Sequence, residues 1–139
     1  MNKTGFLYDE RYQQHKTGNY HPEVPDRLAR IYQGIEEAGL LSKLIPLKAS
    51  PAELKWIELV HDRAYIERFE KACLSGQSMF DSPDNQMCAR TYEIALLAVG
   101  GILNAVSQVM EGDLDNAFCA VRPPGHHAET NKAMGFCYF

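Results

Sequence analysis

The feature that most constrains the fold is the alternation of strand-like and helix-like segments along the chain. Short apolar runs at 5–9, 44–49 and 116–121 are typical of β-strands, and segments with helical spacing lie between them. Strands separated by helices predict an α/β domain with a mainly parallel sheet flanked by helices. In open parallel sheets, binding sites gather beyond the carboxyl ends of the strands.

Three helices are predicted from apolar spacing. The first carries Leu28, Ile31, Ile35 and Ala38 on one face. The second begins after Asp62 and places Tyr65, Phe69 and Cys73 on one face. The third and longest spans 91–111, with one apolar stripe formed by Ala95, Ala98, Ile102, Ala105 and Val109.

Two local features refine this outline. Gly100 and Gly101 interrupt the longest helix, and each costs about 1 kcal/mol relative to alanine, so we expect close packing against a neighbour there. Ser50 is expected to cap a further helix, with Glu53 completing a capping box. The polar segment SGQSMFDSPDNQ, which begins at residue 75, is predicted to be a loop.

The length of 139 residues predicts one domain, spanning residues 1–139, and the default location is the cytoplasm. The net charge of −4 argues against a general nucleic-acid partner, and no apolar run approaches the roughly 18 residues of a membrane span. The start of the chain lacks the apolar core of a secretory signal. The four cysteines form no Cys-x-x-Cys pair, and Cys73 and Cys119 are expected to be buried thiols that pack as small apolar groups.

The segment RPPGHHAE, residues 122–129, follows the last predicted strand directly. Pro123 and Pro124 each fix a backbone φ angle, and Gly125 permits turns that other residues avoid. Such a rigid approach would hold His126 and His127 with little freedom. Three interpretations remain open: an acid–base pair, a loop pair with one exposed imidazole, or two ligands of a metal that needs three or four donors.

Several motifs together carry a resemblance to a known family. AVRPPGHHAE followed by MGFCYF resembles the signature of the zinc-dependent histone deacetylase family, which includes bacterial deacetylases, acetylpolyamine amidohydrolases and acetoin-utilisation proteins. HPEVPDRL, LVHDRAYIERF and DNQMCARTYEIALLAVGG resemble other motifs of that family, so the similarity covers essentially the whole chain. It implies the N-terminal portion of the arginase/deacetylase three-layer fold. It also implies hydrolysis of an acetyl amide, assisted by zinc.

The resemblance assigns roles position by position. His127 corresponds to the general base and later general acid, and His126 to a histidine that stabilises the transition state. Gly135 and Phe136 correspond to the wall of the acyl-lysine tunnel, and Cys137 to a thiol near its floor. The other implied residues lie around the tunnel: Asp84 on the rim, His21 and Pro22 in the entrance loop, and Arg27 at the foot of an internal channel.

Each of these residues has a simpler alternative. Asp84 can be a turn former, Arg27 a surface charge of a helix, and Phe136 a core residue. Cys137 beside the histidines could instead be the nucleophile of a cysteine hydrolase. His15 and His61, which the resemblance leaves without a role, are expected to be polar loop or helix-end residues.

The family's zinc ligands, an Asp-x-His pair and a later Asp, would follow the GFCYF segment. We therefore expect no metal ligands in this chain and no catalysis by it alone. The expected substrate of the complete domain is an acetylated lysine peptide or an acetylated small amine. The alternative is a non-catalytic remnant that serves as a binding or assembly module, either by self-association or by pairing with the C-terminal part of the domain.

Overall fold

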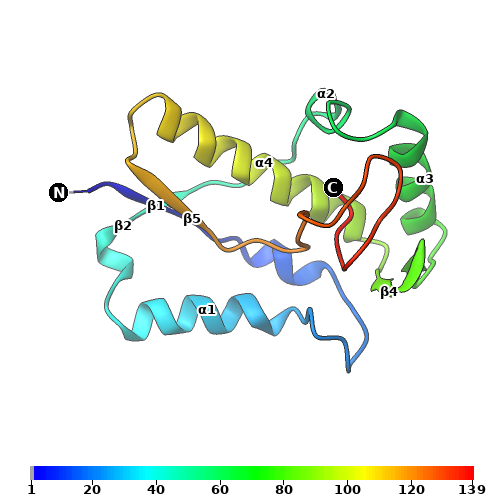
Figure 1. Ribbon diagram of the computed structural model, residues 1–139. Coiled ribbons are helices and arrows are strands. Elements are labelled where there is room, and N and C mark those ends of the chain that lie inside the picture. Colours follow the sequence, from blue (N-terminus) through cyan, green and yellow to red (C-terminus); the bar gives the residue numbers. More distant parts are fainter. Residues whose placement is uncertain (1) are drawn as a thin grey trace.

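The protein is described by a computed structural model, which covers residues 2–139 (Figure 1). Its helices and strands follow in the order β1 (Thr4–Leu7), η1 (Glu10–Gln14), α1 (Asp26–Glu37), η2 (Leu41–Lys43), β2 (Leu44–Leu47), α2 (Leu54–Ile57), α3 (Arg63–Leu74), β3 (Met79–Phe80), β4 (Ser82–Gln86), α4 (Thr91–Met110) and β5 (Asn116–Cys119). The predicted α/β class and parallel sheet are confirmed, since β2, β1 and β5 form a three-stranded sheet in that order with both pairings parallel.

The sheet separates α1 from α4, and the alternation of side chains along β1 explains why (Figure 1). Phe6 points to the α1 side, where its ring stacks on that of Tyr32 at 6.4 Å between centroids. The next residue, Leu7, is fully buried on the α4 side, where its side chain lies against Gly101. One short strand therefore joins two helical layers.

Gly100 and Gly101 confirm the close packing expected of them. A Cβ at Gly101 would stand 2.7 Å from Leu7 Cδ2 and 2.8 Å from the hydroxyl of Tyr12, and one at Gly100 would overlap the backbone of residues 50–52. The same contact corrects the expectation for Ser50. The amide of Ala52 donates to the carbonyl of Leu96 at 2.9 Å, so residues 50–52 lie extended along α4, and α2 begins only at Leu54, without a side-chain cap.

By length and composition alone, α4 is long and apolar enough to cross a membrane, although no such apolar run is expected from the sequence. Core helices of globular proteins meet the same criterion. Its buried residues serve two apolar clusters: Ile94, Leu97 and Ala98 face the sheet, whereas Tyr92 and Ala95 pack with α3. This helix therefore links the sheet to the region that carries the candidate site.

The segment predicted as a loop after residue 75 contains an antiparallel pair, β3 and β4, with an irregular register. Asp81 between them adopts φ 63°, a left-handed value that Asp tolerates better than most residues. The carboxylate of Asp81 accepts a hydrogen bond from the amide of Ala133 at 2.8 Å. This hairpin therefore supports the C-terminal loop that follows the histidine pair.

Candidate functional site

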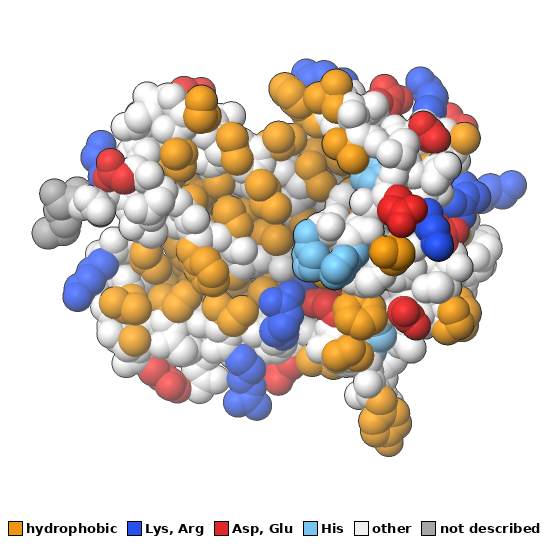
Figure 2. Space-filling view, in the orientation of Figure 1, with side chains coloured by type: hydrophobic (Ala, Val, Ile, Leu, Met, Phe, Trp, Pro, Cys, Tyr) orange, Lys and Arg blue, Asp and Glu red, His pale blue; other side chains and the backbone are white. Residues whose placement is uncertain are grey.

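His126 and His127 lie in the loop that leaves the carboxyl end of β5, as the sequence predicts. Their ring centroids are 4.2 Å apart with 52° between the planes. The amide of Ala128 donates to the carbonyl of Gly125 at 3.2 Å, which closes a turn around the pair. Both side chains are exposed, and Figure 2 shows histidine at the surface of a face with a broad hydrophobic area. The two imidazoles are thus adjacent and accessible from one side.

Residues 134–137 form a tight turn against His127. Met134 and Cys137 exchange backbone hydrogen bonds of 3.2 and 3.0 Å, and the two residues between them, Gly135 and Phe136, have φ values of 57° and 71°. Two successive positive φ values are typical of a type I′ turn. A Cβ at Gly135 would stand 2.8 Å from Cδ2 of His127, so only glycine leaves room for that ring.

His21, Pro22, Asp84 and Phe136 line one hollow of about 470 Å³, whose wall is completed by Gly18, Asn19, Tyr20, Pro83 and Gln86. The ring of His21 meets that of Phe136 edge-on, with centroids 4.5 Å apart. Nε2 of His21 lies 2.8 Å from the carbonyl oxygen of Asp84, which ties the entrance loop to the β3–β4 hairpin. Four residues that the resemblance assigns to the entrance, rim and wall of the substrate tunnel therefore share one concavity.

Arg27 lies on the exposed side of α1 and contacts a buried carboxylate. Its Nη2 donates to Glu23 Oε1 at 3.0 Å and to the carbonyl of Val121 at 3.4 Å. The carboxylate of Glu23 also accepts two hydrogen bonds from Arg122, at 3.1 and 2.8 Å. Arg27 therefore sits at the base of the histidine loop, and its predicted role in a channel stays a prediction.

Arg122 is the largest fully buried side chain, and no sequence pattern singled it out. Besides Glu23, its guanidinium donates to the carbonyl oxygens of Tyr12 and His15. Because Arg122 immediately precedes the two prolines, this network fixes the start of the histidine loop against η1 and the 21–25 segment. A charged residue directly after the apolar run 116–121 was the only local signal, and nothing in the sequence indicated Glu23 as its partner.

His15 belongs to the same network and is 1% exposed. Burial and the positive charge of Arg122 lower its pKa to about 3, so it is neutral at physiological pH. Nε2 of His15 lies 3.6 Å from the Glu23 carboxylate, but that carboxylate is already paired with the guanidinium groups of Arg27 and Arg122. It therefore does not offset the lowering of the His15 pKa by burial. Nδ1 makes a 2.8 Å hydrogen bond with Thr91 Oγ1. His15 ends η1, as expected of a helix-end residue, but it is buried.

Cys137 is buried behind the turn, and its thiol donates to the carbonyl of Gly135 at 3.4 Å. Burial raises the pKa of this thiol, which keeps it protonated. A protonated buried thiol is a poor nucleophile, so the chemistry of the site favours the histidines over Cys137 as the reacting groups.

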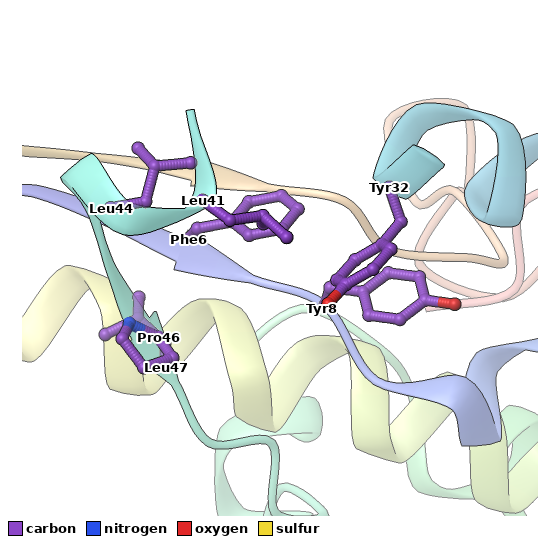
Figure 3. Close-up of a pocket in the computed structure, with 7 residues that line it drawn as sticks. All are labelled: Phe6, Tyr8, Tyr32, Leu41, Leu44, Pro46 and Leu47. Carbon is purple, nitrogen blue, oxygen red and sulfur yellow. The ribbon is translucent and has the colours of Figure 1, made fainter. Parts of the chain in front are cut away.

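The described residues, 2–139, contain no group of three or more His, Cys, Asp or Glu side chains placed to hold a metal ion. A separate hollow of about 230 Å³ lies between α1 and the sheet (Figure 3). Its lining consists of Phe6, Tyr8, Tyr32, Leu41, Leu44, Pro46 and Leu47. None of these residues belongs to the candidate site, and the lining contains no His, Cys, Asp or Glu side chain.

Comparison with known families decides how this arrangement is classified. The model of the histone deacetylase domain matches residues 21–139. The chain belongs to the histone deacetylase family. The matched region contains every residue that the resemblance assigned to the site, from His21 to Cys137.

Individual relatives agree. The chain is 37% identical to histone deacetylase 5 of Arabidopsis thaliana over 99% of its own length and 22% of that protein. It is 33% identical to a probable deacetylase of Archaeoglobus fulgidus, covering 97% of this chain and 38% of the relative. It is 31% identical to a histone deacetylase-like amidohydrolase of Pseudomonas aeruginosa, covering 99% of this chain and 40% of the relative.

The crystal structure of the HDA15 HD domain superposes with a TM-score of 0.92 at 30% identity, covering 99% of this chain and 40% of that one. The predicted arginase/deacetylase-type fold is therefore confirmed for the part of the domain present here. The chain spans two fifths or less of the length of these histone deacetylase relatives.

Proposed function

We propose that this chain supplies the proton-transfer and substrate-tunnel part of a zinc-dependent deacetylase. The substrate is an acetylated lysine peptide or an acetylated small amine, and the products are acetate and the free amine. The observation that carries the proposal is the pair of imidazoles 4.2 Å apart at the end of β5, beside the turn that holds Phe136. The deacetylases among the relatives support it.

In the proposed reaction, His127 accepts a proton from the water that attacks the acetyl carbonyl carbon. The carbon–nitrogen bond of the resulting tetrahedral intermediate then breaks, and His127 returns the proton to the leaving amine. His126 donates a hydrogen bond toward the charge that develops on the reacting group. Two neighbouring imidazoles can divide these tasks because their ring orientations differ by 52°.

Substrate binding is assigned to the hollow beside the turn. The Phe136 ring packs along the apolar stem of the acetylated side chain, with Gly135 behind it. The exposed Asp84 carboxylate accepts hydrogen bonds from backbone amides of a peptide substrate. His21 and Pro22 shape the entrance, because both line the same hollow as Asp84 and Phe136.

Zinc is the metal implied by the family, and it binds three or four protein ligands. Residues 2–139 hold no such ligand group, so they do not fit the ion by themselves, and no step of the proposed reaction is routed through it. We assign the ligands to the part of the domain that the relatives have beyond the matched region. By the same reasoning, residues 1–139 alone bind no catalytic zinc and release no acetate.

We place the reaction in the cytoplasm because all four cysteines are free thiols, as expected for a reducing compartment. Cell fractionation with an antibody against the chain tests this assignment, and recovery in the culture medium would contradict it.

The function is tested with the product of the complete gene, incubated with an acetyl-lysine peptide and, separately, an acetylated polyamine. We expect acetate release from at least one substrate and its loss after treatment with a metal chelator. Absence of release from both would contradict the proposal.

A second function, an assembly module, is favoured by the free side of the sheet. Within residues 2–139, β5 pairs with β1 alone and Phe118 on it is 48% exposed. An apolar groove of about 310 Å³ runs between β5 and α4. Unpaired strand edges recruit further strands. We propose that this edge pairs with the C-terminal part of the domain, and that isolated residues 1–139 self-associate through it. Light scattering tests this point, since monomeric residues 1–139 would contradict it.

A further inference from the structure

Phe136 needs support from outside its own turn. Its φ of 71° lies in the left-handed region, which is unfavourable for a residue that carries a side chain. Such a conformation persists only where the surroundings impose it. The two backbone hydrogen bonds of the turn involve Met134 and Cys137, so the turn itself leaves the Phe136 amide without a partner.

Asn85 supplies that partner. Its side-chain Oδ1 accepts a hydrogen bond from the amide of Phe136 at 2.9 Å, and its Nδ2 donates to the carbonyl of Phe80 at 3.0 Å. Asn85 is 0% exposed, and one partner requires an acceptor while the other requires a donor. The side-chain amide in this orientation satisfies both neighbours.

The neighbouring residues connect Asn85 to the entrance of the site. The carbonyl oxygen of Asp84 lies 2.8 Å from Nε2 of His21, and the His21 ring contacts the Phe136 ring edge-on. Successive residues of β4 therefore hold the two aromatic rings that meet in the hollow: Asp84 through its backbone, Asn85 through its side chain.

We propose that Asn85 is a positioning residue that sets the place of the Phe136 ring in the substrate tunnel. The effect on catalysis rests on the proposed function. The hydrogen bond between Asn85 and Phe136 is a property of the folded chain and does not depend on that function. Asn85 does not touch the substrate. It acts by accepting the Phe136 amide, and its bond to Phe80 stabilises the β3–β4 hairpin.

Two substitutions separate these roles. Asn85→Ala removes both hydrogen bonds. Asn85→Asp keeps an oxygen that accepts from Phe136 but loses the donor to Phe80, and it buries a carboxyl group. If Asn85 only stabilises the fold, both variants should therefore show the same change in KM. If Asn85 positions Phe136, Asn85→Asp should keep a KM near that of wild type, although it is destabilised at least as much as Asn85→Ala.

The first readout is steady-state deacetylation by the product of the complete gene, with kcat and KM measured well below each variant's melting temperature. We expect Asn85→Ala to raise KM for an acetyl-lysine peptide about tenfold with kcat nearly unchanged, because the loss is one of binding. Asn85→Asp should keep KM within about twofold of wild type. The proposal would be overturned if KM rose in both variants in proportion to their loss of melting temperature. An unchanged KM in Asn85→Ala would also overturn it.

The matched control is Asn104→Ala, which also removes a side-chain amide that donates to a backbone carbonyl, that of Lys48 at 3.0 Å. This bond joins α4 to the segment after β2, away from the hollow, so KM should stay at the wild-type value. An equal rise in KM would show that any lost amide has this effect and would overturn the assignment to Asn85.

The second readout is hydrogen exchange at the Phe136 amide, measured by NMR on wild type and both variants. We expect exchange at least about tenfold faster in Asn85→Ala and unchanged in Asn85→Asp. Equal exchange in all three proteins overturns the proposal. This measurement needs no substrate, so it tests the role of Asn85 independently of activity. If the complete protein releases no acetate, that result rejects the proposed function and leaves the positioning role of Asn85 to be decided by hydrogen exchange.

Discussion

Gly135 faces the ring of His127 so closely that a Cβ at position 135 would stand 2.8 Å from Cδ2 and 3.0 Å from Cγ of that imidazole. The turn that presents Phe136 and the loop that presents the histidines are therefore fitted to each other. The proposed acid–base group and the proposed tunnel wall therefore share one packing contact.

We predict that Gly135→Ala displaces the His127 ring and lowers kcat/KM for deacetylation about 10²-fold, the effect of misplacing a reacting group by about 1 Å. The matched control is Gly76→Ala. Gly76 also has a positive φ, 75°, but nothing lies within 4 Å of its Cβ position. That variant carries the backbone strain without the clash, so it should lose stability but keep kcat/KM. Equal activity of the two variants would refute the contact as the cause.

The buried ion pair between Glu23 and Arg122 is predicted to hold the base of the histidine loop. Arg122→Met leaves the buried Glu23 carboxylate with the partly exposed Arg27 as its cationic partner, so the free energy of unfolding should fall by about 3–5 kcal/mol. Urea titration measures this loss. Arg30→Met, which breaks the exposed pair with Asp26, should cost less than about 1 kcal/mol.

A double-mutant cycle refines this prediction. Glu23→Gln combined with Arg122→Met removes both charges, so the double variant should be more stable than the sum of the single losses predicts. Simple additivity of the two losses would show that the two side chains are not coupled, contrary to their direct contact.

His15 predicts a pH dependence of stability. Its pKa is about 3 in the folded protein and about 6.5 when unfolded, so below pH 6.5 the unfolded chain binds the extra proton. Stability contributed by neutral His15 is complete above pH 6.5 and falls as the pH drops, by about 2 kcal/mol between pH 7 and 5. Burial also lowers the pKa of His61, which adds a change of the same sign.

The measurement is urea unfolding of wild type and His15→Gln at pH 7, 6 and 5. Gln cannot take up a proton, so the variant should have the shallower dependence on pH, whatever its stability at pH 7. A variant whose stability falls as steeply as that of wild type would contradict the assignment.

Zinc binding by residues 1–139 is predicted to be absent at the tight, one-to-one level of a catalytic site, because the described residues offer no group of three ligands. Isothermal titration with zinc and an acetate assay on the same sample measure this. One tight site together with turnover of acetyl-lysine would refute the proposed division of the active site.

The fold was predictable where local patterns are strong. The three sheet strands, α1, α3 and α4 follow from apolar spacing, and Gly100 and Gly101 correctly indicated close packing. The predicted helix cap at Ser50 was wrong because the signal of a helix start is local. Residues 50–52 instead contact α4, more than forty residues away in sequence. The β3–β4 hairpin was missed because its residues are polar and its register is irregular.

The site was predictable only in part. The rigid approach of Pro123, Pro124 and Gly125 indicated the histidine loop, and the resemblance supplied the roles. Glu23, Arg122 and Asn85 were not found from the sequence. The contact between Glu23 and Arg122 spans 99 residues and that between Asn85 and Phe136 spans 51, and no local pattern encodes such contacts.

We propose that His127 transfers the protons during deacetylation, first as the base and then as the acid, while His126 stabilises the transition state. The most direct test is acetate release by the product of the complete gene, compared between wild type and His127→Ala after both are confirmed to be folded. We predict that kcat falls about 10²–10⁴-fold in the variant, the usual contribution of a general base. Activity within a few-fold of wild type would contradict the claim.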